Sequence, residues 1–105
     1  MSRFEENLKT LPAVDQYARM ELYADGVTPA AVIENKDGSR GSLRIYYHVS
    51  LKWGGIGPSA AKDAIELYAE HADDARANPG KHPNIDRLFQ VIANDEYYSV
   101  RCYHA

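Results

Sequence analysis

The longest periodic segment of the chain, residues 59–77, constrains the fold most strongly. Its small and apolar side chains recur at helical spacing and form one continuous stripe: Ala61, Ala64, Ile65, Tyr68, Ala72 and Ala75. Charged residues fill the opposite face, namely Lys62, Asp63, Glu66, Glu70 and Asp73. Because alanine predominates in the stripe, we expect this helix to lie close against a sheet.

Strands are predicted in four other segments, which are bounded by turn signals and in most cases alternate between apolar and polar residues. They are residues 17–24, 30–35, 42–50 and 97–103. The third shows the clearest alternation, with one apolar face formed by Leu43, Ile45, Tyr47 and Val49. Since short turns link the first three segments, we expect an antiparallel meander.

Two shorter helices complete the prediction. Ser2 and Glu5 fit a capping box that begins a helix over residues 3–10, and Pro12 ends it. A helix near residues 84–93 follows from the spacing of Ile85, Leu88, Phe89 and Ile92. The order is therefore α-β-β-β-α-α-β. We expect an α+β fold, a two-layer sandwich with helices packed on one face of a mostly antiparallel four-stranded sheet.

Length, charge and cysteine content limit the classes of function. The 105 residues suffice for a single domain, residues 1–105. The net charge is −3, whereas nucleic-acid-binding domains have a basic excess, so no nucleic-acid partner is expected. The single cysteine, Cys102, fits a reducing compartment. The chain has neither a secretory h-region nor an apolar run of ~18 residues, so we expect a cytoplasmic protein with no membrane contact. No motif indicates a cofactor.

The loop NPGKHPN, residues 78–84, combines turn formers with two basic residues. Its asparagine and prolines are suited to ending one helix and beginning the next, so a helix–helix connector explains it. The functional alternative is that free N–H groups at the second helix's N-terminus favour an anion. A carboxylate or phosphate would then be bound by Lys81, His82 and Arg87.

A metal site is a second candidate in the same region. His71 and Asp74 are three residues apart on the long predicted helix, and His82 and Asp86 are four apart. Imidazole and carboxylate ligands of this kind suit zinc. Their spacing matches no compact metal motif, and a half-buried structural histidine is the alternative for His71. No nucleophile elbow or phosphate loop occurs, so no catalytic residue is assigned.

The eight tyrosines are the most unusual feature of the composition. On the predicted strands, tyrosines and arginines share the polar face, and the candidate interface residues are Arg19, Tyr23, Arg44, Tyr46, Arg101 and Tyr103. Interfaces favour both residue types, although cross-strand pairs on a solvated sheet are the alternative. We expect a non-enzymatic protein-binding or adaptor domain that self-associates as a homodimer or binds a protein partner. The alternative is an anion- or metal-binding domain, or an enzyme, centred on residues 71–87.

Two blocks of sequence carry a resemblance to a known family. They are VIENKDGSRGSLRIYYH, residues 32–48, and LYAEHADDARANPGKHPNIDRL, residues 67–88. Together they resemble a family of small bacterial proteins classed as a domain of unknown function. The second block is more specific because it is long and unusual. The resemblance implies a bacterial, cytoplasmic, single-domain protein of about this length, and it implies no catalytic residue.

Overall fold

The chain combines helices with a small antiparallel sheet in an α+β fold. The computed structural model describes residues 2–105. This range forms five helices and three strands, in the order α1 (Arg3–Lys9), β1 (Tyr17–Tyr23), β2 (Pro29–Glu34), α2 (Arg40–Trp53), α3 (Pro58–Tyr68), α4 (Glu70–Ala77), α5 (Pro83–Asn94) and β3 (Ser99–His104). The predicted first helix, first, second and last strands and final helix are confirmed, with boundaries within one or two residues.

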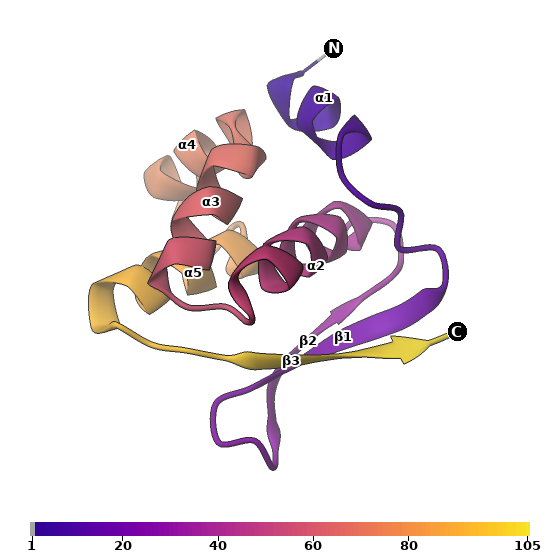
Figure 1. Cartoon of the computed structure of the whole chain (residues 1–105). Coiled ribbons are helices and arrows are strands. Elements are labelled where there is room, and N and C mark those ends of the chain that lie inside the picture. Colours follow the sequence, from indigo (N-terminus) through magenta and orange to yellow (C-terminus); the bar gives the residue numbers. More distant parts are fainter. Residues whose placement is uncertain (1) are drawn as a thin grey trace.

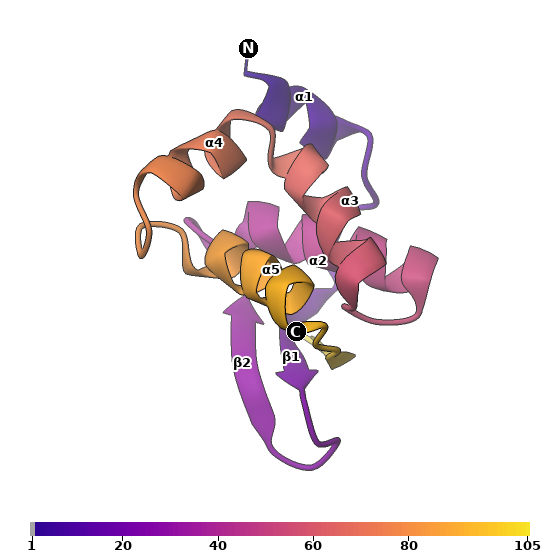
Figure 2. The ribbon, with the colours of Figure 1, turned by 90° about the vertical axis from the view of Figure 1, so that its left-hand side faces the viewer.

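The sheet has β1 at its centre. Both neighbours pair with it antiparallel, in the order β2-β1-β3. Met20 of β1 lies opposite Ile33 of β2 and Cys102 of β3. Met20, Leu22 and Ile33 belong to the buried core, and the helices lie on one side of the sheet (Figure 1). The β1–β2 turn projects beyond the helices (Figures 1 and 2), which leaves Val27 81% exposed.

The predicted third strand, residues 42–50, is wrong because this segment lies within helix α2. Leu43, Tyr46 and Val49 recur every third residue and are fully buried, and Ile45 is buried beside them. The apolar positions of this segment fit both the spacing of a helix and the alternation of a strand. Tertiary packing decides which of the two structures forms. Gly54, with φ of 77°, ends the helix in the left-handed conformation. The sheet therefore has three strands instead of four.

The predicted helix 59–77 is two helices, because the chain turns sharply at Ala69. This residue has φ of 53° and ψ of −120°, a conformation that residues with a Cβ rarely adopt. The predicted stripe is buried on both sides of the turn, from Ala61 to Ala75. However, the alanine-lined α3 packs against α2 and α5, and α2 is the helix that packs against β1 and β2 (Figure 1). The expected contact of the alanine stripe with the sheet is therefore wrong.

Helix α1 lies at the periphery and buries none of its residues. Ser2 caps it as predicted, since its Oγ accepts a hydrogen bond of 3.2 Å from the N–H of Glu5. Two hydrogen bonds tie α1 to the α3–α4 junction: the N–H of Phe4 donates to Oε1 of Glu70 (3.1 Å), and Nδ2 of Asn7 donates to the carbonyl of Leu67 (3.1 Å). No helix within residues 2–105 is long and apolar enough to cross a membrane.

Candidate functional site

A cavity of about 450 Å³ lies where α1 and α4 meet the first turns of α2 and α5. We call it the Lys81 cavity. It is lined by apolar and aromatic side chains together with a set of basic and hydroxyl groups: Phe4, Leu8, Asp37, Gly38, Arg40, Gly41, Ser42, Tyr68, His71, Lys81, His82, Pro83, Asn84 and Ile85. The volume falls within the range of ordinary small-molecule sites.

Aromatic rings form one wall of the Lys81 cavity. The rings of Phe4 and Tyr68 are nearly parallel, at 8°, with centroids 6.0 Å apart, and His71 meets the Phe4 ring edge-on at 4.4 Å. Gly41 permits this arrangement, because a Cβ at that position would lie 2.9 Å from Cζ of Phe4. The buried Tyr68 hydroxyl donates to Oγ of Ser42 at 2.6 Å. Burial raises the pKa of Tyr68 well above its ordinary value, so this hydroxyl stays neutral.

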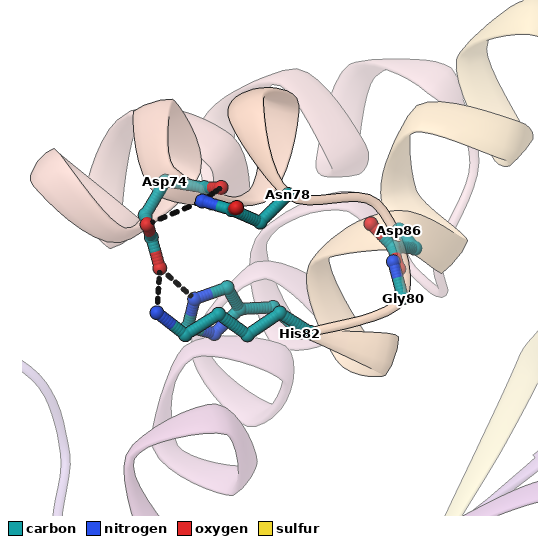
Figure 3. Close-up of polar contacts among 6 residues, drawn as sticks. Asp74, Asn78, Gly80, His82 and Asp86 are labelled. Carbon is teal, nitrogen blue, oxygen red and sulfur yellow. Dashed lines mark hydrogen bonds and ion pairs between the residues drawn. The ribbon is translucent and has the colours of Figure 1, made fainter.

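The loop before α5 supplies the basic groups, and Asp74 of α4 holds them (Figure 3). Oδ2 of Asp74 lies 2.9 Å from Nζ of Lys81 and 2.6 Å from Nε2 of His82. Asn78 adds a hydrogen bond of 2.9 Å from its Nδ2 to Oδ1 of the same carboxylate. The hydrogen bonds from His82 and Lys81 lower the pKa of Asp74 to about 2, so Asp74 is ionised near neutral pH.

Several donors at the cavity still lack a protein acceptor within residues 2–105. Asp74 uses one of the three N–H groups of Lys81. Arg40 donates through Nε to Oδ1 of Asn35 at 2.8 Å and reaches Asp37 only at 3.5 Å, so most of its five N–H groups are unused. The imidazole nitrogens of His71 make no hydrogen bond to residues 2–105.

Backbone donors add to this set, because α2 and α5 both begin at the cavity. Neither N-cap residue, Ser39 or His82, makes a side-chain cap hydrogen bond to its helix. The N–H groups of Gly41, Ser42 and Asn84 find no acceptor within residues 2–105. The first turn of α2 also contains no acidic residue. The positive ends of two helix dipoles therefore face one cavity.

Arg87, predicted as an anion ligand, does not line the Lys81 cavity. Its Nη1 donates to the hydroxyl of Tyr46 at 3.1 Å and to Oδ1 of Asn84 at 2.9 Å. The Tyr46 hydroxyl in turn donates to the carbonyl of Asn84 at 2.5 Å. Tyr46 is fully buried, and this burial raises its pKa to about 12. Arg87 and Tyr46 thus hold the start of α5 in place by hydrogen bonds. We expected Tyr46 on the surface of a strand, and it is instead buried in the core.

The predicted metal ligands come together only in part. Asp74 and His82 form the ion pair described above, and the ring centroid of His71 lies 5.8 Å from that of His82. Asp86 points elsewhere, because its Oδ2 accepts a hydrogen bond of 2.9 Å from the N–H of Gly80 (Figure 3). Across residues 2–105, no group of three or more His, Cys, Asp or Glu side chains is arranged to hold a metal ion.

The predicted tyrosine and arginine face keeps four of its six members. Arg19, Tyr23, Arg101 and Tyr103 lie on β1 and β3, and we call them the outer sheet face. The guanidinium of Arg19 lies 4.2 Å from the Tyr103 ring centroid, and that of Arg101 lies 5.6 Å from the ring centroid of Tyr23. Arg44 is separate, because it lies on α2 and donates from Nη2 to the carbonyl of Leu11 at 2.8 Å.

Sequence reasoning missed the lining residues of α1 and α3 and those at the start of α2. Arg40, Gly41 and Ser42 were assigned to a turn and a strand, so no helix N-terminus was expected there. A signal was present: Leu43, Tyr46 and Val49 recur at helical spacing directly after the polar segment KDGSRGS. Interpreted as a helix, that spacing would have placed free backbone N–H groups beside Arg40 and the preceding turn.

Comparison with known proteins defines the family. A model of the family described as uncharacterized protein conserved in bacteria (DUF2322) matches residues 4–102. No curated protein and no solved structure matches the chain. The family match includes both blocks on which the resemblance was based and nearly the whole chain. This chain therefore belongs to DUF2322, a family of uncharacterised proteins conserved in bacteria.

Proposed function

We propose that this protein is a binding domain for a small acidic ligand, which it holds in the Lys81 cavity. The observation that supports this most directly is the set of unused donors on Lys81, Arg40 and the first turns of α2 and α5, all at one concave site. A carboxylate or phosphate accepts several hydrogen bonds at once and would satisfy these donors together.

The local charge supports an anion over a cation. Lys81 and Arg40 are positively charged, and the two helix N-termini add partial positive charge. Asp74 and Asp37 oppose this, but Asp74 is already engaged by both Lys81 and His82. These two carboxylates come from different elements and are already in ion pairs, so they are poorly placed to hold a cation together.

Thermal unfolding with sodium phosphate tests the proposal. A ligand that binds only the folded state stabilises it, and at tenfold above Kd the gain is about 1.4 kcal/mol. For a domain of this size we expect Tm to rise by roughly 5 °C or more. Sodium chloride at equal ionic strength is the control for screening. Lys81→Ala should remove most of the shift, and Lys62→Ala, at an exposed position of α3, should keep it. An equal shift in both variants would contradict the assignment.

Self-association through the outer sheet face is a second candidate. The helices lie on the other side of the sheet (Figure 1), and β2 and β3 each have one unpaired edge within residues 2–105. Arg101 is exposed, and no carboxylate of residues 2–105 forms an ion pair with it. Glu34 on β2 is exposed near the same face, where it forms an ion pair with Lys36 at 2.8 Å. A second copy could therefore pair arginine with glutamate across a two-fold axis.

Light scattering during size-exclusion chromatography tests this second candidate. A dimer that Arg101→Glu converts to a monomer would support self-association. A monomer at millimolar concentration in the unmodified protein would contradict it. Lys62→Glu is the matched control for the charge change.

A further inference from the structure

We infer that the acidic ligand is an aromatic acid, with one or two flat apolar rings and a single anionic group. This inference rests on the proposed function and adds the class of ligand. Two features of the Lys81 cavity support it: its aromatic wall, and the small number of positive charges that nearby carboxylates leave available.

The aromatic wall favours a flat apolar body. Phe4 and Leu8 from α1, Tyr68 from α3 and Ile85 from α5 contribute the apolar lining. The ring of Phe4 is packed against Tyr68 and His71. Aromatic rings prefer offset-stacked or edge-to-face partners, and this wall presents both orientations.

The wall also disfavours sugars and other polyols. Tyr68 is its hydroxyl-bearing ring, and that hydroxyl already donates to Ser42 at 2.6 Å. Phe4, Leu8 and Ile85 have no polar side-chain atom. A ligand hydroxyl placed against this wall would lose its hydrogen bonds to water without replacement, which costs free energy.

The acidic residues near the cavity limit the ligand to one anionic group. Asp74 lies within 3 Å of both Lys81 and His82, and Asp37 lies 3.5 Å from Arg40. A ligand with several phosphates would bring further negative charge close to these two carboxylates. One carboxylate or phosphate can instead use the unused N–H groups without displacing Asp74.

The size of the cavity agrees with this class. An apolar cavity of about 150 Å³ holds a benzene molecule. The Lys81 cavity, at about 450 Å³, has room for a ring, an acidic group and a short connection or a second ring.

Affinity measurements with fragments separate this inference from the proposed function. The probes are phenyl phosphate and benzoate, each with its ring-free counterpart, inorganic phosphate and acetate, and phenol as the uncharged ring. We expect each aromatic acid to bind at least tenfold more tightly than its ring-free counterpart, and phenol to bind more weakly than either aromatic acid. The stronger of the two aromatic acids shows whether the head group is a phosphate or a carboxylate.

The possible results have distinct meanings. Equal affinities for phenyl phosphate and inorganic phosphate, and for benzoate and acetate, would overturn the aromatic class while leaving acid binding intact. Absence of binding by all four acids would overturn the proposed function itself. Phenol binding as tightly as phenyl phosphate would show a site for rings alone and would contradict both.

A pair of variants locates the ring. Phe4→Leu keeps an apolar side chain on the exposed helix α1, so folding should be retained, and the ratio of phosphate to phenyl phosphate Kd should fall three- to tenfold. Phe89→Leu is the matched control, because Phe89 lies on α5 under Arg76 and outside the cavity lining. An unchanged ratio in Phe4→Leu would place the ring elsewhere and overturn the inference.

Discussion

The Lys81 cavity and the outer sheet face contain similar side chains, yet they differ in where their polar groups are directed. On the outer sheet face, Nε of Arg19 donates to Glu21 at 2.9 Å, the Tyr23 hydroxyl also donates to Glu21, and the hydroxyls of Tyr23 and Tyr103 are 3.1 Å apart. Arg19, Glu21, Tyr23 and Tyr103 are thus linked to one another, whereas Arg101 of the same face contacts the Tyr23 ring and forms no ion pair with residues 2–105. At the cavity, Lys81, Arg40 and three backbone N–H groups keep donors without a protein acceptor in residues 2–105.

This difference separates structural polar groups from groups available to a ligand. Polar groups away from water are almost always hydrogen-bonded in folded proteins, so a closed network needs no further partner. The raised pKa of Tyr23, caused first by its hydrogen bond to Glu21, is one sign of such closure. Open donors in a concave, partly apolar site are instead the reason for our proposal that an anion binds there.

The largest expected effect contrasts two tyrosines that the sequence pattern placed on one face. Tyr46→Ala should lower the free energy of unfolding by about 3–5 kcal/mol, because it removes a fully buried ring and the hydrogen bonds that its hydroxyl makes with the Asn84 carbonyl and Arg87. Tyr103→Ala, at a half-buried position, should cost about 1 kcal/mol. Urea denaturation at pH 7 measures both. Equal losses would show that Tyr46 is not part of the core beneath the cavity.

An intermediate effect concerns the turn that places α4 beside the cavity. Ala69 adopts φ of 53° and ψ of −120°, which glycine adopts without steric cost. Ala69→Gly should therefore stabilise the protein by roughly 1 kcal/mol, net of the greater freedom of glycine in the unfolded chain. Ala72→Gly, inside α4, is the control and should destabilise. Destabilisation by both would show that the turn is unstrained.

The smallest effect is the pH dependence of the Asp74 ion pairs. The pKa of Asp74 is lowered to about 2 in the folded state, against about 3.9 in an unfolded chain. Its contribution to stability is therefore present above pH 4 and is lost as the pH falls towards 2. The difference in urea midpoint between the unsubstituted protein and Asp74→Asn should shrink over that window. A difference that stays constant from pH 5 to pH 2 would contradict the ion-pair geometry.

Sequence reasoning predicted the parts of the fold that depend on local signals. The capping box at Ser2, the turn at Asp25 and the prolines at 79 and 83 correctly marked element ends. Residues 42–50 were misassigned because their apolar positions fit periods of two and of about three and a half equally. The turn at Ala69 has no local signal, since alanine is a good helix former.

The candidate site was predictable only in part. The loop before α5 drew attention through Lys81 and His82, which do line the cavity. Most of the remaining lining comes from α1, α3 and the start of α2. Tyr68 lies 13 residues before Lys81 along the chain, and Ser42 lies 39 residues before it. Once α2 was taken for a strand, no reasoning from spacing could bring Arg40 to Lys81.

The most direct test is to map phenyl phosphate binding by the shifts of backbone amide signals in a ¹H–¹⁵N spectrum. We predict saturable shifts at the amides of Gly41, Ser42 and Asn84, with the amides of Arg101 and Tyr103 unchanged. Shifts confined to the outer sheet face, or none at saturating concentration, would contradict the assignment of the Lys81 cavity as the binding site.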